Sequence, residues 1–179
     1  QYLLGRIIIC DLDNTLINEN DFLFSAYYDI SKNININDDS IYKFLKRSFE
    51  MGHRKDLYQR LNSKFPNCNI SIESFLKILH NHRPRKEMKT LRWFQNFIEI
   101  VNNDFGLYII TNGNPTQQKN KLISTKFPDK VYIEKVIFSN EFIKKPNTSS
   151  FEKLTEDFTL YDPIYIGDSD TDKEFALNI

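Results

Sequence analysis

The amino-acid sequence predicts an α/β fold in which a parallel sheet forms the core and an α-helical subdomain is inserted into it. Three observations support this prediction. Short apolar segments rich in β-branched residues recur at wide intervals, as is typical of strands buried on both faces of a parallel sheet. Helical patterns lie between these segments, which is the alternation of right-handed βαβ units. One long stretch, residues 18–85, contains helical patterns and no such strand.

The predicted strands are short, and three of them stop at a polar turn. Arg6–Cys10 is followed by an acidic turn, and two downstream strands stop at Thr111-Asn112-Gly113 and at Gly167-Asp168. The patterns place strands at residues 6–10, 107–110, 135–138 and 164–166.

Three helices are predicted for the core in addition. Residues 86–104 carry apolar side chains at helical spacing before Gly106. Pro115 suits a first helical turn, so a helix is expected from there to about residue 126. Thr148 or Ser149 can cap the helix that follows.

The stretch 18–85 is predicted to be a subdomain placed between the two parts of the core, residues 1–17 and 86–179. Its four amphipathic patterns are separated by polar, Asn-rich segments. We expect its many aromatic side chains to pack this subdomain and to bind no cofactor.

Composition and charge exclude several classes of function. The chain has 179 residues with 24 Lys+Arg and 24 Asp+Glu, so it has no overall field that would draw it to nucleic acid or to an anionic membrane. No apolar segment has the length of a membrane span, and the start lacks the order of a signal peptide. The two cysteines, Cys10 and Cys68, lie in unlike contexts and do not form a disulfide scaffold. We therefore expect a cytoplasmic protein without nucleic-acid or membrane partners.

The first acidic cluster, Asp11-Leu12-Asp13-Asn14-Thr15, directly follows the first predicted strand. Because side chains alternate in an extended chain, Asp11 and Asp13 can face the same side while Leu12 turns away. Two carboxylates at this distance disfavour each other's ionisation unless a cation lies between them. A polar turn that merely ends the strand explains the pair equally well.

A second acidic cluster, Gly167–Asp172, also follows a predicted strand. Taken alone, it is read as a turn that caps the next helix. However, open α/β sheets bind ligands outside the carboxyl ends of their strands, where both clusters are expected to lie. Hard oxygen ligands that converge on one point suit Mg²⁺.

Two further segments offer the opposite chemistry. Thr111-Asn112-Gly113 brings a hydroxyl and backbone N–H groups to a strand end, and Lys144-Lys145-Pro146 brings ammonium groups. Both suit phosphate oxygens. Each has a simpler explanation as exposed surface when it is considered alone, so the interpretation depends on their coming together with the acidic clusters.

These residues resemble the motifs of the haloacid dehalogenase-like hydrolases. Four motifs occur in this family's order along nearly the whole chain, and Lys145 fits the third better than Lys144 does. The matching residues are Asp11-Leu12-Asp13-Asn14-Thr15, Thr111, Lys145-Pro146 with Phe151, and Gly167-Asp168 with Asp172.

The resemblance implies a Rossmann-like core and covalent phosphoryl transfer. In this family Asp11 would be the nucleophile that becomes an aspartyl phosphate, and Asp13 the acid and base. The resemblance further implies a Mg²⁺ cofactor and two sets of binding residues. These are Asp11, Asp13 through its backbone carbonyl, Asp168 and Asp172 for the metal, and Thr111, Asn112 and Lys145 for the phosphate.

The same resemblance implies that residues 18–85 form a C1-type cap over a small phosphate ester, which would make the chain a phosphatase. Candidate cap residues for reading the substrate are Tyr27, Tyr28, His53 and Arg54. A phosphomutase uses the same first-motif carboxylates and stays open.

Three other activities are weighed against the phosphatase. A phosphonate hydrolase would require a cap lysine, for which the candidates are Lys43, Lys46, Lys55 and Lys64. A dehalogenase needs neither a metal nor an acid at Asp13, and a phospho-acceptor module that must keep its phosphate gains nothing from Asp13.

Overall fold

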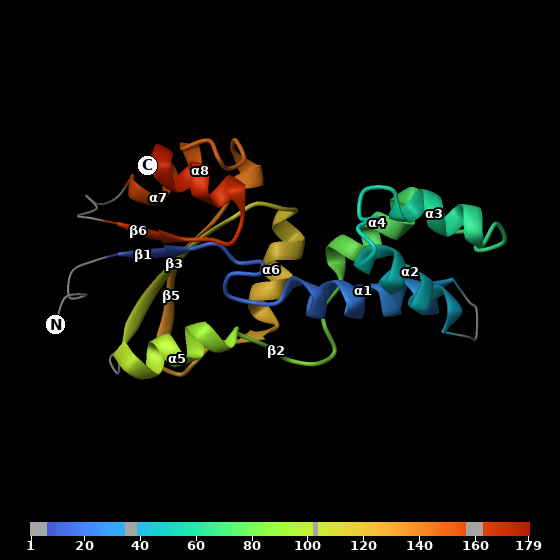
Figure 1. The fold of residues 1–179 in the computed structure, drawn as a ribbon, viewed down its shortest axis with the longest axis horizontal. Coiled ribbons are helices and arrows are strands. Elements are labelled where there is room, and N and C mark those ends of the chain that lie inside the picture. Colours follow the sequence, from blue (N-terminus) through green and yellow to red (C-terminus); the bar gives the residue numbers. More distant parts are fainter. Residues whose placement is uncertain (1–6, 35–38, 102–103, 157–162) are drawn as a thin grey trace. The chain divides into compact units, whose positions relative to one another are not determined.

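A four-stranded parallel sheet lies at the centre of the core and confirms the predicted fold class (Figure 1). Its strands are β1 (Ile8–Cys10), β3 (Phe105–Thr111), β5 (Val131–Phe138) and β6 (Ile164–Ile166), in the order β5-β3-β1-β6. The computed structural model describes residues 7–34, 39–101, 104–156 and 163–179, so Arg6 of the first predicted strand lies outside the described residues.

The central strands are apolar because both of their faces are covered. Ile9 and Cys10 of β1 are fully buried, as are Leu107 and Ile109 of β3. The edge strand β6 is only half-buried, since it pairs with β1 and no other described strand of the sheet. Continuous hydrophobicity therefore marks β6 as a strand of this sheet without distinguishing an edge from a centre.

Two helices pack on one face of the sheet. Residues of β1, β3 and β5 that point to this face form a hydrophobic cluster with Leu154 of α7 (Ser149–Thr155) and Phe175 of α8 (Asp170–Asn178). Thr148 precedes α7 as predicted, but its side chain makes no capping hydrogen bond and donates to Glu152 instead.

Two other predicted core helices are shorter than expected, and the reason is the same for both. Helix α5 (Arg92–Val101) begins late because β2 (Met88–Lys89) precedes it, and α6 (Pro115–Ile123) ends early because β4 (Thr125–Lys126) follows it. β2 and β4 pair in parallel as a separate two-stranded sheet. Two-residue strands carry too little periodicity to be recognised in the sequence.

The chain divides into two compact units: a core unit of Gln1–Glu19 and Glu87–Ile179, and a helical unit of Asn20–Lys86. The helices of this part are α1 (Glu19–Asn33), α2 (Ser40–Glu50), α3 (Leu57–Lys64) and α4 (Ile72–Asn81). Phe22, Ala26 and Ile30 of α1 are fully buried, as their helical spacing predicts. Tyr27 is 2% exposed and packs against Phe49, so it serves the core of this unit and is a poor substrate-reading residue.

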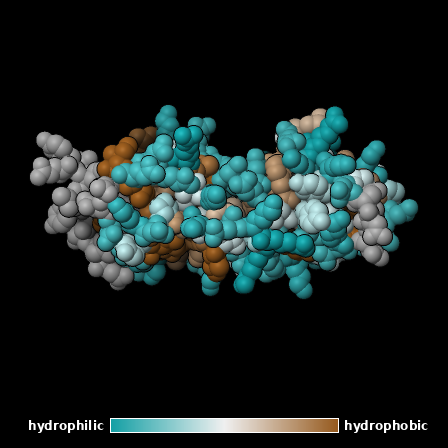
Figure 2. All heavy atoms as spheres, turned by 90° about the horizontal axis from the view of Figure 1, so that it is seen from below, coloured by the Kyte–Doolittle hydropathy of each residue, from teal (hydrophilic) through white to brown (hydrophobic). Residues whose placement is uncertain are grey.

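The face drawn in Figure 2 is mostly hydrophilic where it is coloured by hydropathy. On the face drawn in Figure 2, hydrophobic side chains gather in a few patches between hydrophilic ones. Among the described residues, no helix combines the length and the hydropathy that crossing a membrane requires.

Candidate active site

Three strand ends of the core unit meet at one small cavity. Because β1 pairs with both β3 and β6, the residues that end or follow these strands, Asp11, Thr111 and Asp168, become neighbours. The cavity has a volume of about 230 Å³. All seven residues that the sequence singles out line it: Asp11, Asp13, Thr111, Asn112, Lys145, Asp168 and Asp172. Their juxtaposition is thus found in the structure, while their chemical roles remain predictions.

Lys145 reaches this cavity through a backbone held by Asn112. The Asn112 Oδ1 accepts a hydrogen bond of 3.0 Å from the Lys145 backbone N–H, and its Nδ2 donates to the Lys145 carbonyl at 3.3 Å. The Asn112 side chain therefore fixes the lysine, and binding phosphate with its side-chain amide would compete with these bonds. Lys145 precedes Pro146 in a cis peptide bond.

The ammonium group of Lys145 links two carboxylates in a buried network. Its Nζ lies 2.7 Å from Asp11 Oδ1, 2.5 Å from Asp172 Oδ1 and 2.7 Å from the Tyr165 hydroxyl oxygen. The Tyr165 hydroxyl in turn donates to Asp172 at 2.7 Å. Burial in this network raises the pKa of the Tyr165 hydroxyl well above its ordinary value, so the tyrosine remains a neutral donor.

The surroundings of Asp11 shift the pKa of its carboxyl group in opposite directions. Burial raises its pKa to about 6, against the lowering effect of Lys145, and the nearby Asp172 raises it further. A divalent cation beside Asp11 would favour the ionised carboxylate and so lower this pKa.

The carboxylates supply a donor set that fits Mg²⁺. Asp11, Asp168 and Asp172 each offer one oxygen, and these three oxygens lie within 4.8 Å of one another. Hard oxygen ligands at this spacing suit an ion that prefers six oxygens and keeps several waters. Asp168 is exposed and can accept from the Thr15 hydroxyl at 3.3 Å, which leaves this side of the cluster open to solvent.

Asp172 is oriented by the helix that it begins. Ser169 and Asp172 form a capping box at the start of α8, with the Ser169 hydroxyl 2.6 Å from Asp172 Oδ2. Burial alone would raise the pKa of Asp172, but hydrogen bonds from Lys145, Ser169 and Tyr165 bring it below its ordinary value. The carboxylate is therefore ionised at neutral pH.

Asp13 lies on a tight turn and not on an extension of β1. The backbone N–H groups of Leu16 and Ile17 both donate to the Leu12 carbonyl, and Asn14 has a φ of 56°. Asp11 and Asp13 line one cavity as predicted. They are brought there by the turn and not by the alternation of side chains along an extended strand. The Asp13 carboxylate stands apart from the three-oxygen cluster, so a metal role for Asp13 would use its backbone carbonyl.

Two residues of α6 that sequence reasoning missed hold the Asp13 carboxylate. Lys121 Nζ lies 2.7 Å from each carboxylate oxygen, and Gln118 Nε2 donates to Asp13 Oδ2 at 2.8 Å. Burial raises the pKa of Asp13 above its ordinary value, against the lowering effect of Lys121, while Glu19 raises it further. Gln118 and Lys121 are three positions apart, hence on one helix face, which is the only signal that the sequence offered.

Gly167 is required by the close approach of α8. A Cβ atom at this position would lie 2.4 Å from both Cβ and Cγ of Asp172. Gly167→Ala is therefore expected to displace Asp172 and to lower the free energy of unfolding by about 1–3 kcal/mol, measured by urea denaturation. Gly106→Ala is the matched control, because the atoms nearest to its Cβ would belong to the flexible Glu134 side chain. Equal stability of the two variants would contradict the close approach.

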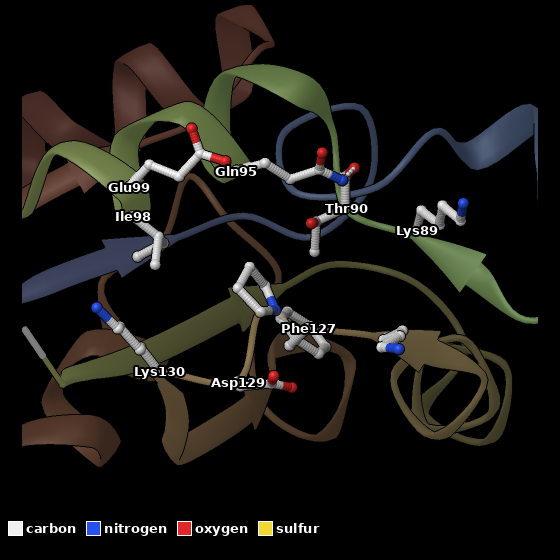
Figure 3. Close-up of a pocket in the computed structure, with 10 residues that line it drawn as sticks. Lys89, Thr90, Gln95, Ile98, Glu99, Phe127, Asp129 and Lys130 are labelled. Atoms are coloured by element: carbon white, nitrogen blue, oxygen red, sulfur yellow. Dashed lines mark hydrogen bonds between the residues drawn. The ribbon is translucent and has the colours of Figure 1, made fainter. Parts of the chain in front are cut away.

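A second cavity of the core unit, of about 610 Å³, lies elsewhere (Figure 3). Its lining mixes the ammonium groups of Lys89 and Lys130 with the carboxylates of Glu99 and Asp129. It contains none of the seven predicted site residues. The smaller acidic cavity is therefore the candidate active site.

Comparison with solved structures finds the same fold at low sequence identity. A magnesium-bound protein described as the HAD-hydrolase YfnB of Bacillus subtilis has a TM-score of 0.62 and 19% identity, and the match covers 96% of this chain and 82% of that protein's chain. A protein described as a β-phosphoglucomutase of Thermotoga maritima has a TM-score of 0.55 and 13% identity, and the match covers 97% of this chain and 81% of that protein's chain. The L-2-haloacid dehalogenase PA0810 has a TM-score of 0.61 and 12% identity, and the match covers 97% of this chain and 80% of that protein's chain. At such identities these likenesses establish the fold and leave the reaction open.

Sequence comparison gives a more specific result. No curated protein sequence matches the chain significantly. A family model described as haloacid dehalogenase-like hydrolase matches residues 8–179. Since this match spans nearly the whole chain and all four motifs, the protein belongs to the haloacid dehalogenase-like hydrolases.

Proposed function

We propose that this hydrolase is a Mg²⁺-dependent phosphatase that releases inorganic phosphate from a small phosphorylated metabolite. The observation that carries this proposal is a second carboxylate, Asp13, that lines the cavity of Asp11 and has its own hydrogen-bond donors. Breaking an alkyl phosphate ester through an aspartyl phosphate requires an acid for the leaving oxygen and a base for water, and Asp13 is suited to both. A dehalogenase gains nothing from such a group.

In the first half-reaction, an oxygen of Asp11 attacks phosphorus. A bond forms between this oxygen and phosphorus while the bond from phosphorus to the leaving oxygen breaks. Asp13 gives its proton to the leaving oxygen, so an alcohol departs and an aspartyl phosphate remains. The raised pKa of Asp13 favours the protonated form that this step requires.

In the second half-reaction, Asp13 takes a proton from water. The water oxygen attacks phosphorus, the bond to Asp11 breaks, and both carboxyl groups return to their starting state. Dividing one difficult displacement into two is the advantage of the covalent intermediate. Thr111 and Lys145 would bind the phosphoryl oxygens, and Lys145 also orients Asp11 through the 2.7 Å contact.

Asp11, Asp168 and the backbone carbonyl of Asp13 would hold the metal, with Asp172 nearby. Bound there, Mg²⁺ supplies positive charge that offsets the repulsion between a carboxylate and a phosphate. We further assign residues 18–85 the role of a substrate-selecting cap, on their position between the first and second motifs. A cytoplasmic location accords with the two free cysteines, both buried.

The proposal is tested by measuring phosphate release from a panel of metabolite phosphates and p-nitrophenyl phosphate, with Mg²⁺ or with EDTA. We expect release of inorganic phosphate in Mg²⁺ and its loss in EDTA. Transfer of the phosphoryl group to a second metabolite position without phosphate release would instead indicate a phosphomutase. A stably phosphorylated chain would indicate an acceptor module, and metal-independent halide release from 2-haloacids would indicate a dehalogenase.

A further inference from the structure

We propose that Lys121 is a positioning residue that fixes the Asp13 carboxylate in the orientation needed for proton transfer. The inference rests on the proposed phosphatase function. It adds to the four motifs a further charged residue that none of them contains.

The contact between Lys121 and Asp13 is buried and symmetric. Lys121 is 1% exposed, and its Nζ lies 2.7 Å from both Asp13 Oδ1 and Asp13 Oδ2. A lysine is rarely placed so deeply without a charged partner, because removing an ammonium group from water is costly. Glu19 Oε1, at 3.7 Å, adds a second carboxylate to the same ammonium group.

Helix α6 carries Lys121, and the N-terminal end of this helix is anchored beside the site. The helix begins at Pro115, directly after the turn that ends β3, and Asn114 caps it by accepting from Gln117 N–H. One turn before Lys121, Gln118 Nε2 bridges Asp13 Oδ2 at 2.8 Å and Thr111 Oγ1 at 2.7 Å. The helix thus ties the carboxylate of Asp13 to the hydroxyl expected to bind phosphate.

These bonds orient Asp13 and still leave it able to react. Lys121 and Gln118 together make three hydrogen bonds to this carboxylate, whereas a carboxylate has about four acceptor sites. One lone pair therefore remains to carry the proton that Asp13 gives to the leaving oxygen and later takes from water. Lys145 contacts Asp11 and Lys121 contacts Asp13, so the two carboxylates with different tasks are held by different cations.

The proposal makes a prediction that depends on the leaving group. In the first half-reaction the Asp13 O–H bond breaks as the leaving oxygen gains its proton. An alkoxide needs this proton, whereas 2,4-dinitrophenolate departs without it. Since kcat/KM reports the reaction only as far as release of the leaving group, loss of Asp13 orientation should affect kcat/KM for alkyl phosphates and spare it for 2,4-dinitrophenyl phosphate.

The test compares Lys121→Met and Lys121→Gln with wild type in Mg²⁺ on two esters: 2,4-dinitrophenyl phosphate and the alkyl phosphate of the metabolite panel that wild type hydrolyses fastest. We expect kcat/KM for the alkyl phosphate to fall about 100-fold and that for 2,4-dinitrophenyl phosphate to fall less than about 3-fold. Asp13→Asn should show the same difference between the losses of kcat/KM on the two esters. Lys119→Met is the matched control, because Lys119 is exposed on the same helix, and it should leave both values unchanged.

Each remaining outcome overturns the proposal. Equal losses on both esters, or no loss on either, would show that Lys121 does not act through Asp13. Loss of the near-ultraviolet circular dichroism signal in both Lys121 variants would assign the residue to folding alone. If wild type hydrolyses no ester of the metabolite panel, the proposed phosphatase function fails and this inference with it. If wild type is active and the Lys121 variants lose kcat/KM equally on the two esters, the inference alone fails.

Discussion

Asp11→Asn is expected to abolish phosphate release, lowering kcat by a factor on the order of 10⁴ or more. An amide oxygen carries no negative charge and is a poor nucleophile for phosphorus, so no aspartyl phosphate can form. The loss should be seen as absence of inorganic phosphate on a good substrate and as absence of label on the chain after brief exposure to a ³²P-labelled ester. Wild type should acquire a label that hydroxylamine removes.

The same substitution should leave the fold intact, which separates chemistry from stability. Burial raises the pKa of Asp11 to about 6, so the folded state favours the protonated carboxyl relative to the unfolded chain. Above pH 6 the ionised carboxylate therefore costs stability, and Asn resembles the protonated form. We expect the melting temperature of Asp11→Asn, measured in EDTA at pH 7.5, to equal or exceed that of wild type. Full activity in this variant would exclude Asp11 as the nucleophile.

The positions of the strand-end residues could be predicted from the sequence because two independent signals coincide there. The apolar segments before Asp11, Thr111 and Asp168 fix where strands end, and parallel pairing brings those ends to one edge of the sheet. Lys145 follows no such strand, so its placement depended on the resemblance to a known family. The structure shows why that resemblance succeeds: Asn112 binds the Lys145 backbone across 33 residues of chain.

Lys121, Gln118 and Tyr165 could not be identified in the same way. Lysine and glutamine are common on exposed helix faces, and nothing in their spacing on α6 distinguishes a buried lysine from a solvated one. Tyr165 lies within an apolar strand, where its ring packs against Phe175 and its hydroxyl contacts Lys145. Such residues acquire a role only when the tertiary structure brings their partners to them. In the contacts of Lys121, Tyr165 and Lys145, these partners lie 7 to 134 positions away along the chain.

Lys145→Met is expected to lower kcat/KM by about 10³-fold, because two effects act together. The phosphoryl oxygens lose a cation, and Asp11 loses the group that lowers its pKa. Without Lys145, less positive charge opposes the effects of burial and of the neighbouring Asp172, so the pKa of Asp11 should be higher in the variant than in wild type. At pH 7 a larger fraction of the nucleophile is then protonated and inactive.

This second effect gives Lys145→Met a pH dependence that simple loss of a binding group lacks. As pH rises from 6 to 8, the variant's Asp11 should ionise and its kcat/KM should increase, while wild-type kcat/KM changes less over this range. Removing the cation that Asp11 and Asp172 share also destabilises the fold, by about 3 kcal/mol, so the assays belong well below the melting temperature of the variant. Lys144→Met is the matched control, since Lys144 is the exposed neighbour and should show wild-type activity and pH dependence. A parallel loss at every pH would limit Lys145 to phosphate binding and remove its influence on Asp11.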